Sequence, residues 1–84
     1  MEEMLKKFYA EYEARYTRWV NADNMLDAAL KYPEMFGEDS IRRWQSSHSR
    51  HYGEVLELRR VARIFGIDES KLEEIENRII DNLC

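Results

Sequence analysis

The stretch YPEMFGEDS, residues 32–40, decides the fold because it interrupts two long helical patterns. Pro33 ends the first pattern, since a proline pushes the residue before it out of the α-helical region. Gly37 suits a reversal of the chain, and Asp39 or Ser40 can cap the helix that follows. A connection this short predicts that the two flanking helices fold back on each other as an antiparallel hairpin.

Before this connection, residues 3–31 carry the apolar repeat of a long helix. Apolar residues recur three and four positions apart and so share one face; they are Leu5, Phe8, Tyr12, Trp19, Ala22, Leu26 and Ala29. A second stripe of Tyr9, Tyr16 and Val20 widens this face. Residues 21–24 include polar residues of low helix propensity, so the helix either continues, kinks or splits there.

After the connection, residues 40–65 form the second predicted helix, which Gly66 ends. Its seam alternates spacings of three and four and consists of Ile41, Trp44, His48, His51, Val55, Leu58, Ala62 and Phe65. A third helix over residues 69–83 begins either at an Asp68 cap or at a capping box of Ser70 and Glu73. Its apolar face consists of Leu72, Ile75, Ile79 and Leu83.

These patterns predict a single all-α domain over residues 1–84, with a long antiparallel helical hairpin and a shorter third helix. The third helix is expected to cover only the end of the hairpin that holds Leu5, Phe8, Val61 and Ile64. The other end would then expose an apolar patch too large to remain in water. We therefore predict that the chain forms a homodimer, a helical bundle built about a two-fold axis. The predicted interface residues are Tyr16, Trp19, Val20, Leu26, Trp44 and His48.

Two alternatives to this dimer follow from the same patterns. A different, unidentified protein partner would cover the patch equally well. Alternatively, the third helix covers Tyr9, and little surface then remains for dimerisation.

Composition and charge exclude several classes of function. The net charge is −4, which argues against binding to nucleic acid or to anionic membranes. No segment approaches the roughly 20 apolar residues of a membrane span, and no signal peptide is evident. The single cysteine, Cys84, rules out an internal disulfide framework. We therefore expect a cytoplasmic protein.

The sequence holds no recognisable catalytic pattern. There is no glycine-rich phosphate loop and no H-E-x-x-H motif, and the serines next to His48 in a helix point away from it. We expect a non-enzymatic interaction module without a cofactor, acting as an adaptor, regulator or inhibitor. Trp19 and Trp44 are the predicted anchors of its interface.

His48 and His51 lie three residues apart in the second seam, which allows three interpretations. They set the register of the helices as buried polar residues, they respond to pH, or they supply two ligands of a metal site. By antiparallel counting, His48 lies near Asp23 and His51 near Trp19. The same count pairs Arg15 with Glu54 or Glu57.

The alternative function is regulation through nucleic acid. Arg42, Arg43, Arg50 and Arg60 share one face of the second helix and could grip a phosphate backbone. The corner at residues 62–75 resembles a helix-turn-helix pattern. However, its second helix presents Glu69, Glu73, Glu74 and Glu76, which repel phosphate.

Overall fold

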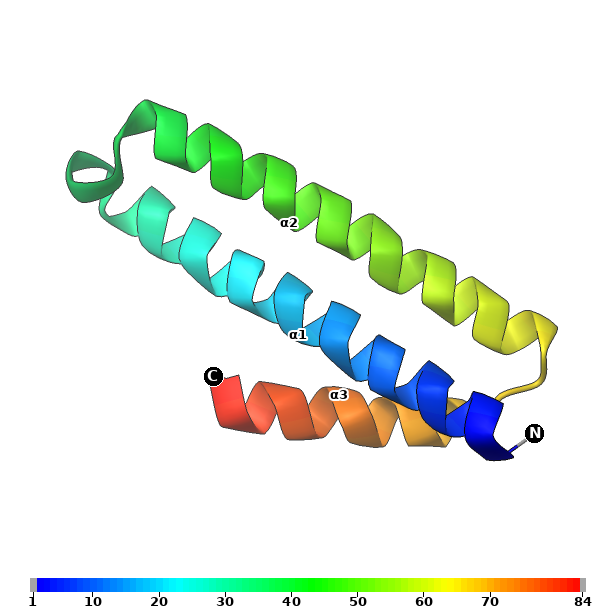
Figure 1. Ribbon diagram of the computed structural model, residues 1–84. Helices are drawn as coiled ribbons and strands as arrows, with labels where there is room; N and C mark the ends of the chain where they lie inside the picture. Colours follow the sequence, from blue (N-terminus) through cyan, green and yellow to red (C-terminus); the bar gives the residue numbers. More distant parts are fainter. Residues whose placement is uncertain (1, 84) are drawn as a thin grey trace.

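The computed structural model describes residues 2–83, which form three helices and no strand (Figure 1). Helix α1 spans Glu2–Lys31, α2 spans Pro33–Ile64 and α3 spans Glu69–Leu83. The all-α prediction is therefore confirmed, and the elongated body measures 49 × 22 × 17 Å. The single cysteine, Cys84, lies outside the described residues.

The connection between α1 and α2 is tighter than predicted. Pro33 begins a helical turn, and the helix is broken at Gly37, whose φ of 77° and ψ of 164° are essentially restricted to glycine. The helix resumes immediately afterwards, so Asp39 and Ser40 lie inside α2. The prediction that one of them caps the helix is wrong, because the glycine already supplies the reversal.

Helix α1 is continuous through the polar residues 21–24. Asn21 and Asp23 are exposed, whereas Ala22 between them is buried. The Asn24 side chain donates a hydrogen bond of 3.1 Å to the carbonyl of Leu83 at the end of α3. Packing of the apolar face thus overrides the low helix propensity of these residues.

The corner between α2 and α3 is fixed by backbone hydrogen bonds. Gly66 adopts a positive φ of 69°. Its N–H donates to the carbonyl of Arg63 at 3.3 Å, and the N–H of Ile67 donates to the carbonyl of Ala62 at 2.8 Å. These two bonds satisfy carbonyls at the end of α2 and direct the chain away from the helix axis.

Asp68 begins α3. Its carboxylate accepts hydrogen bonds from the backbone N–H of Ser70 at 3.0 Å and from the Ser70 hydroxyl at 2.9 Å. These bonds lower the pKa of Asp68. The Asp68 cap, one of the two predicted starts of this helix, is therefore confirmed.

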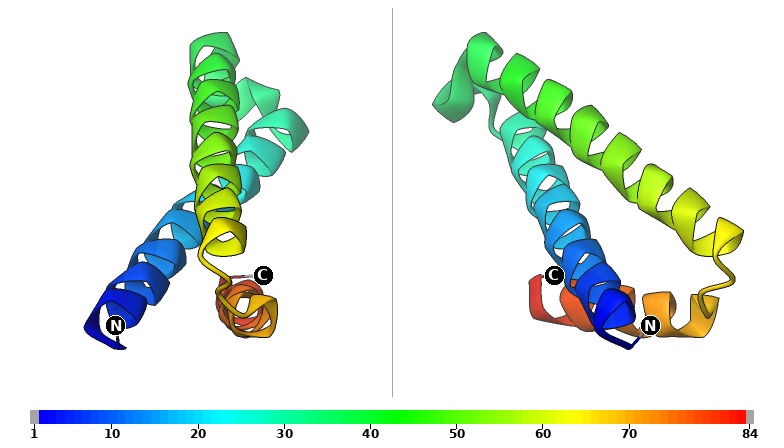
Figure 2. Two further views of the ribbon diagram at one scale, coloured as in Figure 1. Left: turned by 90° about the vertical axis from the view of Figure 1, so that its right-hand side faces the viewer. Right: turned by 45° about the vertical axis from the view of Figure 1, so that its right-hand side comes forward.

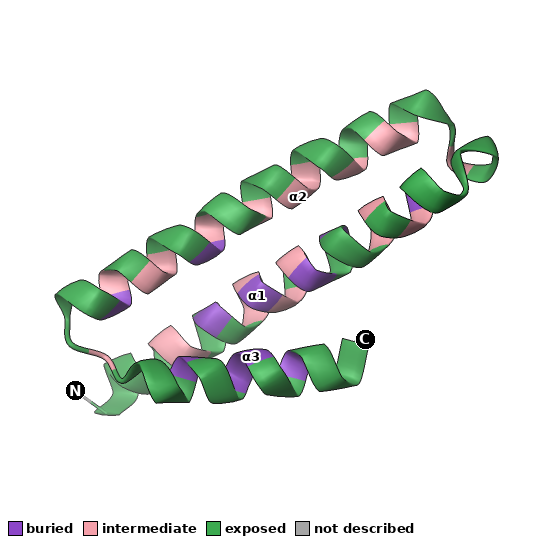
Figure 3. Cartoon of the chain, turned by 180° about the vertical axis from the view of Figure 1, so that it is seen from behind, coloured by how far each residue is buried: buried purple, intermediate pink, exposed green. Residues whose placement is uncertain are grey.

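The core lies along α1, which packs against both other helices (Figures 1 and 3). The buried apolar side chains of this core come from all three helices and are Tyr12, Tyr16, Val20, Val55, Ala62, Leu72, Ile75 and Ile79. Two views show α3 beside α1, running in the same general direction (Figures 1 and 2), and its end reaches Asn24. It makes few contacts with α2.

This placement corrects the predicted coverage by the third helix. Ile64 is exposed rather than covered, and Phe65 is 76% exposed. The physical reason is that α3 packs along α1 instead of lying across both legs of the hairpin. Tyr16 and Val20 share the core with residues of α3, and an ion pair of 3.2 Å between Arg78 and Glu13 links α3 to α1.

Candidate functional site

Two of the six predicted interface residues are buried inside the chain. Tyr16 and Val20 belong to the core, and Val20 is only 7% exposed. Trp19, Leu26, Trp44 and His48 are half-buried. The expected exposure of Val20 is therefore wrong, because α3 covers this side of α1.

Trp19 is enclosed by residues of both legs of the hairpin. Its ring centroid lies 5.3 Å from that of Tyr16 on α1 and 5.3 Å from that of Tyr52 on α2. Its indole N–H donates to Nε2 of His48 at 3.2 Å. Trp19 thus packs within the hairpin, and only part of its surface remains exposed to solvent.

His48 lies beside its predicted partner. Its Nε2 is 2.9 Å from Oδ1 of Asp23, which confirms that prediction. The indole N–H of Trp19 bonds to His48, and the predicted position of His51 near Trp19 stays a prediction. His51 Nδ1 is buried without a hydrogen bond and lies 3.5 Å from Oε1 of Glu54, one turn along α2.

Arg15 joins the two legs of the hairpin. It donates to Glu54 on α2 and to Glu11 on its own helix, which confirms the predicted pairing with Glu54. The hydrogen bond from Arg15 lowers the pKa of Glu54. The pairs Asp23–His48 and Arg15–Glu54 are partly exposed and follow one antiparallel register of the two helices.

A metal site at His48 and His51 would need further ligands. Among residues 2–83, no group of three or more His, Cys, Asp or Glu side chains is placed to hold a metal ion. Both imidazoles instead face carboxylates of the hairpin.

The four arginines of the nucleic-acid alternative lie on the outer side of α2. Arg42 lies 3.9 Å from Glu38, and Arg60 lies 3.8 Å from Glu57. Arg43 and Arg50 are exposed. Two of the four positive charges are thus partly neutralised, and nucleic-acid binding stays a prediction.

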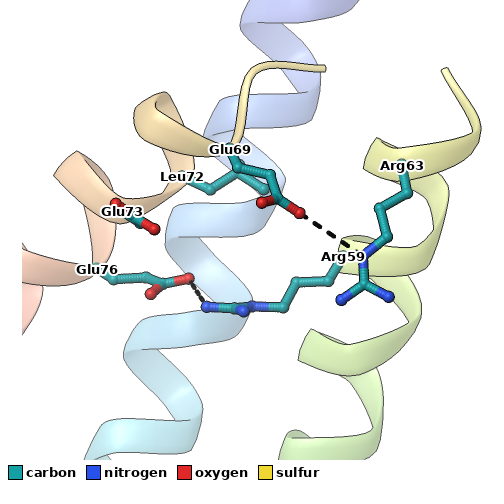
Figure 4. A pocket seen from close by; sticks show the side chains of 6 residues that line it. All are labelled: Arg59, Arg63, Glu69, Leu72, Glu73 and Glu76. Atoms are coloured by element: carbon teal, nitrogen blue, oxygen red, sulfur yellow. Dashed lines mark hydrogen bonds and ion pairs between the residues drawn. The ribbon is translucent and has the colours of Figure 1, made fainter. Parts of the chain in front are cut away.

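A polar cluster that was not predicted joins all three helices. Tyr12 is fully buried, donates to the carboxylate of Glu76 on α3, and accepts a hydrogen bond of 3.0 Å from Nε of Arg59 on α2. Arg59 also pairs with Glu76 (Figure 4). Glu76 was expected on the exposed acidic face of α3, so that expectation is wrong.

This cluster links the three helices and offers no room for a substrate. Burial and the hydrogen bond to Glu76 raise the pKa of Tyr12, so the phenol stays neutral. The space beside the cluster, bordered by Arg59, Arg63 and Glu69, has a volume of about 30 Å³ (Figure 4). Such a space admits a water molecule but not an organic substrate.

A wider apolar groove lies at the open end of the hairpin, where α1 begins and α2 turns into α3. We call it the open-end groove. Its volume is about 480 Å³, and it is lined by Met4, Leu5, Phe8, Tyr9, Val61, Phe65, Gly66, Ile67 and Asp68. The right-hand view of Figure 2 shows the two legs of the hairpin farther apart at this end than at the connection.

The border of the open-end groove is exposed and apolar. Met4 is 75% exposed and Phe65 is 76% exposed. Among the described residues 2–83, the one charged side chain in the lining is Asp68, which caps α3. Exposed apolar side chains therefore lie at the end of the hairpin that was predicted to be covered, as well as at the connection, where Leu30, Tyr32 and Met35 are exposed.

Comparison of the chain with protein-family models, curated proteins and solved structures finds no match. Within residues 2–83, no helix is long and apolar enough to cross a membrane.

Proposed function

We propose that this protein is a small, non-enzymatic interaction module, an adaptor, regulator or inhibitor, that binds a partner protein in the open-end groove. The observation that carries the proposal is an apolar space of about 480 Å³ bordered by the exposed side chains of Met4 and Phe65. Proteins rarely leave contiguous apolar surface uncovered unless another molecule binds there.

The composition of the groove favours a protein over a small metabolite. Small-ligand sites usually combine apolar walls with a few polar groups that orient the ligand. In the open-end groove the one carboxylate, Asp68, already accepts hydrogen bonds from Ser70. The flexible Met4 side chain suits an apolar face of a partner helix.

We place this interaction in the cytoplasm. The chain contains one cysteine, so it cannot form the internal disulfide framework common in small secreted domains. This proposal replaces the interface predicted around Trp19 and Trp44 with one at the opposite end of the hairpin.

Affinity capture with two methionine variants tests the proposal. Met4→Glu places a charge at the border of the groove, whereas Met35→Glu places one near the helix connection, where the methionine is 82% exposed. Proteins retained from native extracts by the wild type and by Met35→Glu should be lost with Met4→Glu. Retention that Met4→Glu leaves unchanged would contradict the proposal.

A further inference from the structure

The seam pattern of α2 continues through the corner into α3. The seam alternates spacings of three and four residues as far as Phe65. Counted onward with the same alternation, it reaches residues of α3 without a slip; they are Glu69, Leu72, Glu76, Ile79 and Leu83. Among them, Leu72, Glu76 and Ile79 are buried in the structure. A single straight helix from α2 through α3 would therefore carry one unbroken seam.

The corner that interrupts this seam is short and depends on a glycine. Residues 65–68 lie outside both helices, and Gly66 has a φ of 69°. A Cβ added to Gly66 would meet no atom of the described chain within 4 Å, so the backbone conformation alone favours glycine there. Glycine adopts the helical conformation as well. The same residue therefore allows either the corner or a continuous helix.

Helix α3 is held mainly by α1. It makes few contacts with α2, to which the corner joins it. Its buried apolar residues Leu72, Ile75 and Ile79 belong to the same core cluster as Tyr12 and Tyr16 of α1. This packing requires the α1 surface but does not require that α1 and α3 belong to the same copy of the chain.

We propose that two copies of this chain exchange α3 by straightening the corner at Gly66. In the structure α3 runs opposite to α2 (Figure 1). Two straightened α2–α3 helices related by a two-fold axis at the corner also run antiparallel. The α3 of each copy then lies on the α1 of the other, and its Glu76 completes the Tyr12–Arg59 cluster there.

The exchange preserves the contacts between α3 and α1 and changes the corner. It gives up the Asp68 cap, and it places the exposed Phe65 on a continuous seam near the two-fold axis. Domain swapping is a low-cost route to a dimer, and short hinges favour it. This dimer goes beyond the proposed function and does not depend on it, because it is held by the packing of α3 on α1.

Two substitutions at the corner should act in opposite directions. Gly66→Ala strains the corner and favours a continuous helix, so we expect it to strengthen dimerisation about tenfold or more in sedimentation equilibrium. Glu69→Pro suits the first residue of α3 but breaks a continuous helix, so it should weaken dimerisation of the wild type and of Gly66→Ala about a hundredfold or more. Gly53→Ala, the control within α2, should leave dimerisation unchanged.

NMR spectra of mixed isotope-labelled and unlabelled chains identify the exchange itself. In the exchanged dimer, the methyl groups of Ile75 and Ile79 of one chain lie in the same core as the Tyr12 and Tyr16 rings of the other. We therefore expect nuclear Overhauser effects between labelled methyl groups and unlabelled aromatic rings. A dimer that lacks them would overturn the proposal.

Sedimentation gives two further results that would refute the exchange. One is a wild type that stays monomeric at every accessible concentration, and the other is a dimer that Glu69→Pro leaves intact. Circular dichroism reports whether each variant keeps its helices. If Gly66→Ala fails to fold, the comparison of the wild type with Glu69→Pro still decides the question.

Discussion

At the scale of single residues, Tyr12 connects the three helices. Its hydroxyl donates to Glu76 of α3 and accepts from Arg59 of α2. Sequence periodicity correctly placed Tyr12 on the apolar face of α1. Periodicity could not identify the two polar partners, because Glu76 and Arg59 lie far from Tyr12 in the sequence and resemble ordinary surface charges.

Tyr12→Phe should destabilise the protein by about 1–2 kcal/mol near neutral pH, because it removes a buried hydrogen-bonding group. Burial raises the pKa of Tyr12, so its stabilising contribution is fully present below the ordinary tyrosine pKa of about 10 and is lost as the pH rises above that value. Urea unfolding should show the wild-type advantage shrinking in that range. Tyr52→Phe, at an exposed tyrosine, is the control.

His48 is a second residue with polar partners on another helix. Its Nε2 faces both the indole N–H of Trp19 and the carboxylate of Asp23, at 3.2 and 2.9 Å. An unprotonated Nε2 can accept from Trp19 but cannot donate to Asp23, and a protonated Nε2 does the reverse. The two contacts therefore require different protonation states of this nitrogen.

His48→Ala should remove the Trp19–His48 hydrogen bond. The indole N–H resonance of Trp19 in NMR spectra reports this change directly. An indole signal that His48→Ala leaves unchanged would contradict this contact.

At the scale of the helices, the glycines differ in their tolerance of a side chain. Gly53 lies within α2, and a Cβ added there would meet no atom within 4 Å. Gly37 also has open space around it, but its positive φ excludes most other residues. The two positions therefore differ in backbone conformation and not in the space available for a side chain.

Gly53→Ala should stabilise the protein by about 1 kcal/mol, the helix preference of alanine over glycine. Gly37→Ala should destabilise it by about 1–3 kcal/mol, because alanine is strained in that backbone conformation. Paired thermal or chemical unfolding experiments compare the two. Effects of the same sign would show that the connection does not require the conformation of Gly37.

The lengths of the helices and the faces they bury were largely predictable, because both follow from local spacing. The seam of α2 is buried or half-buried from Ile41 to Ala62, as expected. Its last member, Phe65, is exposed because the Gly66 corner turns the chain at that point. The direction taken after such a corner depends on packing between helices and could not be derived from spacing alone.

At the scale of the whole molecule, the side on which α3 docks decides which surface remains available. The wide apolar face of α1 was recognised in the sequence, but Tyr16 and Val20 were assigned to a second copy of the chain. In the structure both residues lie in one core cluster with Leu72, Ile75 and Ile79 of α3. An exposed apolar groove is found instead at the end bordered by Met4 and Phe65.

Because α3 packs on α1 and makes few contacts with α2, it should open as a separate unit without global unfolding. Native-state hydrogen exchange should give the amides of α3 a lower opening free energy than those at the centre of the α1–α2 hairpin. Glu76→Gln should reduce the protection of α3 more than that of the hairpin. Equal protection in all three helices would instead indicate a single cooperative unit. The protein would thus have a stable two-helix base and a third helix whose attachment can be weakened independently.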